Sequence, residues 1–389
     1  MAQPGAAHRP YLIDVSRLIW RFWTRRLPTG IDRVCLAYLD HFGDRAQATF
    51  QRGGRHFILS PEDSDRLFVV LRGGRAASQT RLVRIIAAAL TLRGRGAAHP
   101  GTFYLNVGHT GLDEPTLPSW IAGNRLRAIF LVHDLIPITF PQYCRAGEGD
   151  RHARRMTNVL ASAHGIICNS QATVADLTDF AKTRGVPMPA ATAAWISGPP
   201  PRPNPGPPPL ATPYFVTLGT IEGRKNHLLL LEIWHHLIDS MGTQAPTLIV
   251  IGQRGWEAGP ALALLDRPSE FAGKVIELND CGDDDLAAWI GGARALLMPS
   301  FAEGFGLPIV EALALGTPVI ASNLAIFREI GGSIPTFANP GDRAEWTRLI
   351  RAFAGDSSER ARQLEQMKAY KAPSWGDHFA IVDQWLATL

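Results

Sequence analysis

The stretch ALLMPSFAEGFGLPIVEALALGTPVIAS, residues 295–322, decides the fold of this protein. It opens with a continuous apolar run over 295–298, which predicts a buried strand. Pro308 is suited to the start of a helix and Gly316 to its end, so a helix is expected over 308–315. A further apolar run over 318–321 predicts the next strand. Continuously apolar strands separated by a helix are typical of a parallel sheet with helices on both faces.

The same alternation continues along the chain. In the second half we expect strands at Tyr214–Leu218, Thr247–Gly252 and Lys274–Leu278, with helices at Asn226–Ser240 and Asp284–Gly291. In the first half we expect strands at Tyr11–Val15, Thr102–Val107, Ala128–Val132 and Gly165–Cys168, with helices at Thr29–His41 and Arg151–His164. The fold class is therefore α/β, with two Rossmann-like doubly wound domains that bind ligands at the carboxyl ends of their strands.

A proline-rich segment divides the chain. Nine of the fifteen residues from Pro199 to Pro213 are proline, which fits neither a helix nor an inner strand. We expect an N-terminal domain over 1–198, a linker over 199–213 and a C-terminal domain over 214–373. An amphipathic helix is expected over 374–389, where it would cap the second domain.

Composition limits the class of protein. Residues 1–200 carry 24 Lys and Arg against 14 Asp and Glu, whereas the remainder carries 15 against 21, so the two halves differ in charge. The four cysteines are far apart and show no C-x-x-C spacing, which fits a reducing compartment. The sequence contains no membrane-spanning run, and its first ten residues have no apolar core of a signal peptide. We expect a cytoplasmic protein.

The 295–322 stretch also predicts a ligand site. Gly304 and Gly306 permit a tight turn, and the free N–H groups around residues 305–307 would form an anion site at the helix N-terminus. Glu303 precedes this turn and Glu311 lies about one helical turn inside. An ionised carboxylate accepts hydrogen bonds, for example from sugar hydroxyls. The alternative is a turn with two solvated glutamates, because exposed carboxylates are common.

The surrounding residues favour the ligand site. EGFGLPIVE followed by EALALGTPVIAS resembles the E-x7-E signature of the family 4 retaining glycosyltransferases, which have the GT-B fold. The resemblance implies that Glu303 contacts the transferred sugar and that Glu311 binds the nucleotide ribose. It also implies backbone contacts from Phe305, Gly306 and Leu307 to sugar and phosphate.

The segment LGTIEGRKN, residues 218–226, is similar to the family's G-T-x-x-x-R-K-N motif. Two cations in a turn after a strand can neutralise a diphosphate, although a bare Arg-Lys pair would as readily be a surface pair. The resemblance places Lys225 on the pyrophosphate with Arg224 nearby. Many relatives carry Arg where this chain has Thr220, after Gly219. Relatives read the base through backbone at positions that match Leu278 to Cys281.

The first half supplies candidates on the acceptor side. HDLIP, residues 133–137, resembles a segment of the family that places His133 near the donor sugar, where a neutral imidazole could donate a hydrogen bond. A lone histidine is otherwise more often structural. Gly30 lies in a loop that resembles the family's S-G-I-x-R loop, with Asp32 in place of the commoner Gly. His109, Asp134 and Asn169 follow expected strands, and polar loop residues are their alternative interpretation.

Two basic segments account for the charge of the first half. One is the run from Trp20 to Arg26, and the other is Arg72–Arg95, interpreted as a basic amphipathic helix with six arginines. Such helices dock on anionic membranes, so we expect a peripheral inner-membrane contact. The alternatives are a solvated cationic face and nucleic-acid binding, for which the sequence shows no motif.

The resemblance implies a retaining, metal-independent glycosyltransferase with no cofactor, acting on a glycan or lipid-linked acceptor in bacterial surface polysaccharide synthesis. The motifs resemble the bacterial polysaccharide mannosyltransferase branch most, so GDP-mannose is the favoured donor; a UDP-sugar or a deoxysugar nucleotide is the alternative. A non-catalytic nucleotide-binding relative also remains. An NAD-dependent oxidoreductase would require a G-x-G-x-x-G turn, which is missing from the sequence, and an epimerase fits the E-x7-E context less well.

Overall fold

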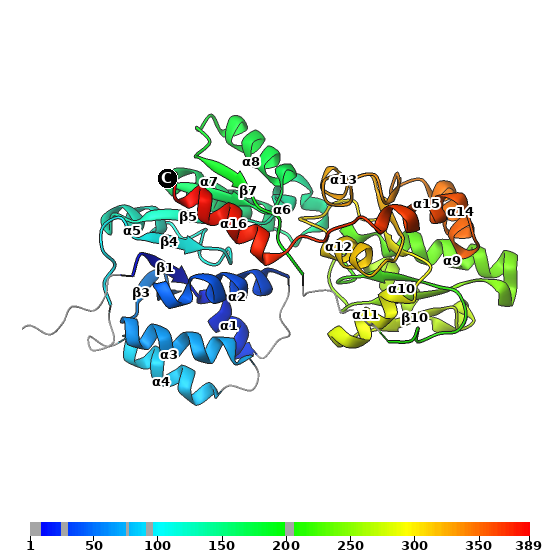
Figure 1. Ribbon diagram of the computed structural model, residues 1–389, viewed down its shortest axis with the longest axis horizontal. Helices are drawn as coiled ribbons and strands as arrows, with labels where there is room; N and C mark the ends of the chain where they lie inside the picture. Colours follow the sequence, from blue (N-terminus) through cyan, green and yellow to red (C-terminus); the bar gives the residue numbers. More distant parts are fainter. Residues whose placement is uncertain (1–8, 25–29, 75–77, 91–95, 199–205) are drawn as a thin grey trace, which may run out of the picture. The chain divides into compact units, whose positions relative to one another are not determined.

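A computed structural model describes residues 9–24, 30–74, 78–90, 96–198 and 206–389. The chain forms two compact units. Unit 1 comprises residues 1–135, 150–196 and 375–389, and unit 2 comprises residues 136–149 and 197–374. Each is an α/β sandwich, as the apolar strand pattern predicts, and Figure 1 shows helices lying on both sides of each sheet.

Unit 1 contains a seven-stranded sheet of order β3-β2-β1-β4-β5-β6-β7. All neighbours are parallel except β2 and β3, which form an antiparallel hairpin at the edge. The strands are β1 (Tyr11–Asp14), β2 (Ala46–Arg52), β3 (Arg55–Ile58), β4 (Phe103–Asn106), β5 (Arg127–Val132), β6 (Gly165–Cys168) and β7 (Ala191–Ala193). The helices are α1 (Ser16–Thr24), α2 (Gly30–Phe42), α3 (Pro61–Arg72), α4 (Gln79–Leu90), α5 (Leu117–Gly123), α7 (Glu148–Ser162), α8 (Gln171–Arg184) and α16 (Trp375–Leu386).

Unit 2 contains a six-stranded parallel sheet of order β10-β9-β8-β11-β12-β13. The strands are β8 (Tyr214–Leu218), β9 (Thr247–Ile251), β10 (Val275–Leu278), β11 (Leu296–Met298), β12 (Val319–Ser322) and β13 (Thr336–Ala338). The helices are α6 (Ile136–Thr139), α9 (His227–Met241), α10 (Gly259–Leu265), α11 (Asp283–Gly291), α12 (Leu307–Ala314), α13 (Ala325–Gly331), α14 (Arg343–Ala354) and α15 (Ser358–Met367). Its core buries Trp234 and Trp346 completely.

The boundary between the units does not follow the proline-rich segment alone. Residues 136–149 belong to unit 2, where the Tyr143 ring stacks on Phe301 with centroids 5.3 Å apart and Arg145 lies over the Trp256 ring. Of the linker, residues 206–213 are described and form neither helix nor strand; residues 199–205 lie outside the described part. The expected domain limits at 198 and 213 therefore describe one crossing between the units, whereas the chain crosses between them at further points as well.

The last helix corrects the sequence-based interpretation. We expected residues 374–389 to cap the second domain, but α16, red in Figure 1, packs on unit 1. Its Phe379 ring stacks on His41 with centroids 4.0 Å apart, and the Nε2 atom of its buried His378 lies 2.9 Å from the Tyr38 hydroxyl. An amphipathic pattern shows that a helix has an apolar face but does not identify the surface that receives it.

A second correction concerns residues 72–95. They do not form one basic helix, because Arg72 ends α3 and a separate helix, α4, begins at Gln79. Arg81 and Arg84 lie on α4, whereas residues 75–77 and 91–95, with three of the six arginines, are outside the described part of the chain. Gly73 and Gly74 separate the two helices, as expected from the low helix propensity of glycine.

Candidate functional site

The strand order of unit 2 locates a binding edge. The chain runs from β8 outward through β9 to β10, and then from β11 outward through β12 to β13 on the other side. The order therefore reverses between the neighbouring strands β8 and β11, and ligands of doubly wound sheets bind beyond the carboxyl ends of the strands at such a point. The turn at 219–226 follows β8 and the turn at 299–306 follows β11. The two sequence motifs consequently meet at this edge.

The side chains of these turns form a buried ionic cluster around Glu303. One Glu303 carboxylate oxygen lies 2.5 Å from Lys225 Nζ, and the other accepts a hydrogen bond of 2.9 Å from the Arg224 guanidinium. Ser300 donates a third contact, 2.7 Å long, through its hydroxyl. Arg224 also pairs with Glu222 at 2.6 Å. The cluster thus combines two cations with two carboxylates.

Burial and charge together fix the ionisation of Glu303. Its side chain is only 5% exposed. Burial by itself raises the pKa of this carboxyl, but the charges of Lys225 and Arg224 outweigh that effect and lower the pKa to about 2. Glu303 is therefore a carboxylate at neutral pH. Burial raises the pKa of Glu222, and Arg224 opposes this rise.

Two glycines shape the backbone of the cluster. Gly219 has φ of +129°, and a Cβ there would lie 3.3 Å from Lys225 Nζ. Gly306 precedes α12 with φ of +101°, and a Cβ there would lie 2.8 Å from the Phe327 ring. A side chain at either position would be strained in backbone conformation and crowded by its neighbours. These glycines are thus required by the packing of the turns.

The N-terminus of α12 adjoins the cluster. The helix begins at Leu307, with Pro308 second, one residue earlier than the sequence indicated. Within the described residues no side chain caps this end, so its backbone dipole remains available to an anion. The Phe305 ring is buried, which holds the preceding loop in place. The anion site expected at Phe305, Gly306 and Leu307 therefore has the local structure that it requires.

Glu311 lies on α12, four residues after Leu307, at half-buried exposure. A Cβ on Gly198 would lie 2.9 Å from its carboxylate, so the backbone at Gly198 passes close to this side chain. The contact of Glu311 with the nucleotide ribose stays a prediction from the resemblance.

The contacts of Glu303 come from its own unit. Arg224, Lys225 and Ser300, which bind its carboxylate, all belong to unit 2.

The remaining candidates of unit 2 lie around the same edge. Thr220 packs against Gly255, whose Cβ position would be 2.6 Å from the threonine methyl group. The Leu278 carbonyl accepts a hydrogen bond from Gly252 N, and Cys281 follows β10 as a half-buried thiol. Base recognition by Leu278 and Cys281 stays a prediction.

Unit 1 has an equivalent point between β1 and β4, where its strand order reverses. His133 follows β5 nearby and is buried. Its Nε2 atom lies 2.8 Å from the Val107 carbonyl oxygen, so Nε2 carries the proton and donates it. Burial lowers the His133 pKa to about 4. The neutral ring therefore presents Nδ1 as an acceptor, which corrects the expectation that His133 donates to a sugar hydroxyl.

A histidine cluster surrounds His133. The His109 ring lies 4.9 Å from that of His133 and 5.7 Å from that of His152, measured between centroids. Burial holds the His109 pKa well below its usual range. The His152 ring lies 3.0 Å from the Asp134 carbonyl oxygen. Three imidazoles thus share one buried region beside the strand ends, and burial keeps those of His109 and His133 neutral.

Asn169 has a structural part in this region. Its amide nitrogen donates to the His133 carbonyl oxygen at 2.7 Å, and its amide oxygen accepts from the Thr173 hydroxyl at 2.8 Å. The side chain is 2% exposed. Asn169 therefore ties the turn after β5 to α8, and these bonds do not support its assignment to acceptor contact.

Gly30 is the first residue of α2 and is exposed; residues 25–29, which precede it, lie outside the described part of the chain. Asp32 is buried and forms ion pairs with Arg17 at 2.7 Å and Arg21 at 2.9 Å. The aspartate that replaces the family's glycine thus links α2 to α1.

Three residues of these clusters were not among the sequence candidates. Glu222 and Ser300 lie inside the quoted motifs, so their proximity to Glu303 could have been expected from the meeting of the two turns. His152 carries no sequence signal, because it lies on α7 within an ordinary amphipathic pattern.

Comparison with known proteins agrees with this geometry. Residues 212–356 match the family model described as glycosyl transferases group 1. The O-antigen chain mannosyltransferase B of Escherichia coli is 36% identical over 166 residues, which are 42% of this chain and 42% of that protein. The serotype-specific mannosyltransferase WbdA of Escherichia coli is 28% identical over 276 residues, 61% of this chain and 32% of that protein. The chain thus spans less than half the length of these relatives.

Solved structures share the whole fold. Anabaena HepE, crystallised with UDP and glucose, superposes with a TM-score of 0.68 at 15% identity, covering 98% of this chain and all of that one. Sucrose-phosphate synthase from Thermosynechococcus elongatus superposes with a TM-score of 0.62 at 14% identity, covering 98% and 99%. With the motifs, the strand orders and the family match in agreement, residues 212–356 are similar to a group 1 glycosyltransferase domain, and the chain has the GT-B fold.

Proposed function

We propose that this protein is a retaining glycosyltransferase of family 4 that moves mannose from GDP-mannose to a glycan or lipid-linked acceptor in bacterial surface polysaccharide synthesis. The observation that carries the proposal is the Glu303–Lys225–Arg224 cluster beside the uncapped N-terminus of α12. The mannosyltransferase names of the relatives support the choice of sugar.

The cluster fits the departure of a nucleoside diphosphate. As the bond between the anomeric carbon and the phosphate oxygen breaks, negative charge develops on the diphosphate. Lys225, Arg224 and the N-terminus of α12 would stabilise that charge. The acceptor oxygen forms its bond to the anomeric carbon on the same face, and its proton passes to the departing phosphate oxygen. Glu303, already ionised, would accept hydrogen bonds from the sugar hydroxyls.

We propose that the reaction needs no metal, because the two cations would supply the charge that a divalent ion supplies elsewhere. His133 would accept a hydrogen bond from a sugar hydroxyl through Nδ1. Equal initial rates with EDTA and with added magnesium would support the metal-independent reaction; a rate that requires magnesium would contradict it.

A donor screen tests the proposal most directly. Product release from GDP-mannose, UDP-sugars and deoxysugar nucleotides is followed with an isolated glycan acceptor, and the thermal shift with GDP and UDP is measured in parallel. We expect turnover of GDP-mannose and stabilisation by GDP. Stabilisation by UDP alone would favour the alternative donor class. NMR of the product's anomeric proton then reports retention or inversion.

The Glu303→Ala variant separates an enzyme from a nucleotide-binding relative. We expect transfer to be abolished while nucleotide binding is largely kept, since Glu303 is proposed to act on the sugar. Wild-type turnover by this variant would remove Glu303 from the site. Nucleotide binding by the wild-type protein without any transfer would favour the non-catalytic alternative.

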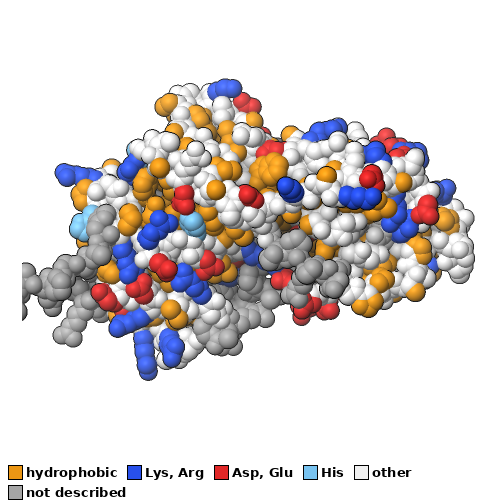
Figure 2. Space-filling model, in the orientation of Figure 1, with side chains coloured by type: hydrophobic (Ala, Val, Ile, Leu, Met, Phe, Trp, Pro, Cys, Tyr) orange, Lys and Arg blue, Asp and Glu red, His pale blue; other side chains and the backbone are white. Residues whose placement is uncertain are grey.

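We also propose a peripheral contact with the inner membrane through α1, α3 and α4. Within the described residues, no helix has the length and apolarity needed to cross a bilayer. Trp20 and Trp23 on α1 are 48% and 57% exposed, and Val69 and Val83 are exposed on α3 and α4. Figure 2 shows Lys and Arg side chains over the part of unit 1 where Figure 1 places α3 and α4. Exposed tryptophan beside arginine suits the surface of an anionic bilayer.

Vesicle sedimentation tests this contact. We expect binding to vesicles with anionic lipid, weaker binding at high salt, and loss of binding in a Trp20→Ser/Trp23→Ser variant. A Val186→Ser variant, changed at an exposed apolar residue of unit 1 outside these helices, is the control. Equal binding to neutral and anionic vesicles would contradict the proposal.

A further inference from the structure

The ionic cluster of unit 2 contains a second buried carboxyl group, that of Glu222. Its side chain is 4% exposed and pairs with the Arg224 guanidinium at 2.6 Å. Glu222 lies in the turn after β8, immediately before the helical turn Gly223–Lys225. In the proposed reaction Glu222 has no part, although it shares a cation with the carboxylate of Glu303.

Arg224 lies between the two carboxylates. One of its terminal nitrogen atoms donates to the Glu303 carboxylate and to the Ala302 carbonyl oxygen, each at 2.9 Å. The other terminal nitrogen contacts Glu222. The guanidinium is thus held by partners from both turns of the site. A ligand that brings charge to Arg224 therefore acts on both carboxylates.

The formal charges of the cluster cancel. Arg224 and Lys225 are the two cations, and Glu222 and Glu303 supply two negative charges when both are ionised. A nucleoside diphosphate brings further negative charge to the same cations. Both carboxylates would oppose it, because charges in a buried site are screened little by solvent and salt. Protonation of one carboxyl group would leave the cluster with a net positive charge that favours the diphosphate.

The turn after β9 also packs against Glu222. A Cβ on Gly255 would lie 3.6 Å from the Cβ of Glu222. The charged side chains of this turn are Arg254, which forms ion pairs with two other carboxylates, and Glu257, which is exposed. The cations that act on Glu222 are therefore those of the cluster itself.

The pKa values indicate which group takes up a proton first. Burial raises the pKa of Glu222 above its ordinary value of 4.5. Arg224 and Lys225 oppose that rise, and Glu303 adds to it. By contrast, the pKa of Glu303 is about 2, and burial lowers the pKa of His227, at the start of α9, to about 4. Glu222 therefore binds a proton before Glu303 and His227 when negative charge arrives.

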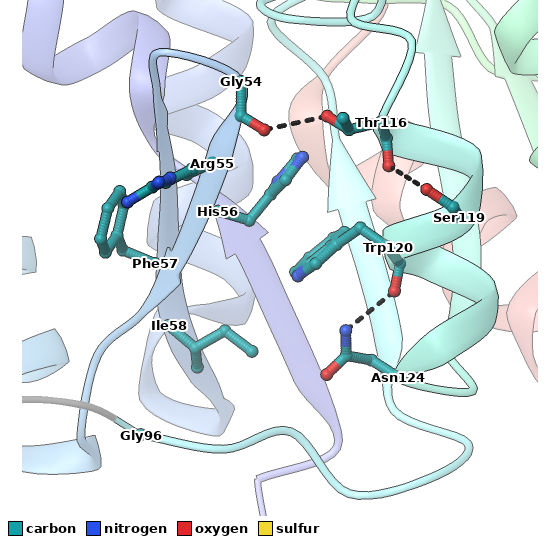
Figure 3. A pocket seen from close by; sticks show the side chains of 10 residues that line it. All are labelled: Gly54, Arg55, His56, Phe57, Ile58, Gly96, Thr116, Ser119, Trp120 and Asn124. Atoms are coloured by element: carbon teal, nitrogen blue, oxygen red, sulfur yellow. Dashed lines mark hydrogen bonds between the residues drawn. The ribbon is translucent and has the colours of Figure 1, made fainter.

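A buried group of unit 1 provides a contrast. In the groove between β3 and α5, Figure 3 shows the His56 ring against the Trp120 ring, with centroids 4.0 Å apart. Burial lowers the His56 pKa to about 4, and Arg55, the charged residue of the lining, projects to the other side of β3. A proton on His56 would thus respond to no ligand-binding cation, whereas one on Glu222 would.

We propose that Glu222 takes up a proton from solvent when a nucleoside diphosphate binds to Arg224 and Lys225, and returns it when the diphosphate leaves. This proton uptake rests on the proposed function, since the diphosphate must reach the same two cations. Glu222 is a positioning residue, because it acts through Arg224 and does not touch the reacting atoms. Donor binding and product release would therefore depend on pH through Glu222.

Isothermal titration calorimetry of the full chain tests the uptake. GDP and UDP are the probes, because both carry the diphosphate and the base is then immaterial. Titrations at pH 7.5 in buffers of different ionisation enthalpy report the protons taken up with each nucleotide. We expect uptake by the wild-type protein and none by Glu222→Gln. The nucleotide's own phosphate contributes equally to both titrations, so the difference between them belongs to Glu222.

The affinity of Glu222→Gln gives a second readout. The substitution keeps the shape of the side chain and removes its charge at every pH. We expect GDP to bind about tenfold more tightly than to the wild-type protein at pH 8, as one nearby charge in a partly buried site would cause. The difference should shrink towards pH 6, where Glu222 itself becomes protonated. If Glu222 served only to hold Arg224 in place, its loss would instead weaken binding.

Glu257→Gln is the matched control, because it removes the same charge from an exposed glutamate of the neighbouring turn, and it should bind GDP normally. Weaker or unchanged binding by Glu222→Gln, or proton uptake that persists in it, would overturn the inference and leave the proposed function intact. Binding of neither nucleotide by the wild-type protein would contradict the proposed function and the inference together. If Glu222→Gln does not fold, the wild-type titrations decide, and binding without proton uptake would overturn the inference.

Discussion

Glu303 and its two cations show how single side chains determine the state of the site. The carboxylate is buried and ionised because Lys225 and Arg224 lie within hydrogen-bonding distance. Without a ligand these charges satisfy one another, so a diphosphate that engages the cations must share them with Glu303. Removal of one partner from such a group leaves an uncompensated buried charge, which is expensive.

The first prediction follows from this balance. Glu303→Gln keeps the shape of the side chain but removes its charge, and we expect unit 2 to lose about 3 kcal/mol of stability because Lys225 is left unpaired. A second change, Lys225→Met, should restore part of that loss. Scanning calorimetry of the single and double variants measures both effects.

A nucleoside diphosphate provides the internal control for this prediction. It brings negative charge to the same cations, so GDP should raise the melting temperature of Glu303→Gln more than that of the wild-type protein. An equal or smaller rise would show that the diphosphate does not contact Lys225 and Arg224.

His133 gives a prediction about pH. Its pKa is about 4 in the folded protein, below the usual value of about 6.5, so the unfolded chain binds more protons between these values. Stability should therefore be complete above pH 6.5 and fall as the pH is lowered towards 4, by at most about 3 kcal/mol for this residue. Thermal unfolding at pH 7, 5.5 and 4.5 measures the decline.

His133→Asn should show a shallower decline than the wild-type protein, because the group that takes up the proton is gone. The exposed His236→Asn should follow the wild-type curve. Parallel curves for His133→Asn and the wild-type protein would exclude His133 as a source of the acid sensitivity.

Among the elements, α12 depends on the particular backbone conformation of the residue before it. The helix begins directly after Gly306, whose positive φ directs the chain into the helix and whose missing side chain leaves room for Phe327. The glycine thus sets both the direction of the helix and its distance from α13. The loop with Glu303 precedes it, so the position of the carboxylate depends on the same turn.

We expect Gly306→Ala to destabilise unit 2 by about 2 kcal/mol or more, because it adds backbone strain and a contact 2.8 Å from the Phe327 ring. Transfer activity should fall with it. Gly316→Ala is the matched control: it also has positive φ, +74°, but its Cβ would contact nothing within 4 Å, so only the backbone cost of about 1 kcal/mol remains. Equal losses in the two variants would show that the contact with Phe327 is unimportant.

The whole molecule is held together by segments that change units. Residues 136–149 pack in unit 2 although unit 1 lies on both sides of them in the sequence, and α16 packs in unit 1 although unit 2 precedes it. The proline-rich segment is thus one of several covalent connections between the units. Cleavage of the proline-rich segment alone would therefore leave other connections between the units.

We expect that cutting a protease site inserted at the exposed residues 206–209 leaves the two fragments together on gel filtration under native conditions. The C-terminal fragment keeps α16, which buries Phe379 and Val382 in unit 1. A Phe379→Ala/Val382→Ala variant should let the cut fragments separate more readily, whereas Ile381→Ala, at an exposed position of the same helix, should not. Complete separation of the unsubstituted fragments would contradict the prediction.

The sequence by itself determined the fold class, most strand positions and the turns that carry the site, because these depend on local apolar patterns, glycine, proline and a specific motif. It also placed Glu303, and the pair Arg224 and Lys225, in turns that follow two of the strands. The tertiary structure decided which charges pair, which nitrogen of His133 is free to accept, and which unit receives α16. These depend on contacts between residues far apart in the chain, such as Arg224 with Glu303 and Tyr38 with His378, and local patterns do not contain them. The stack of His56 on Trp120 arises in the same way, from an edge strand and a helix that only the folded sheet brings together.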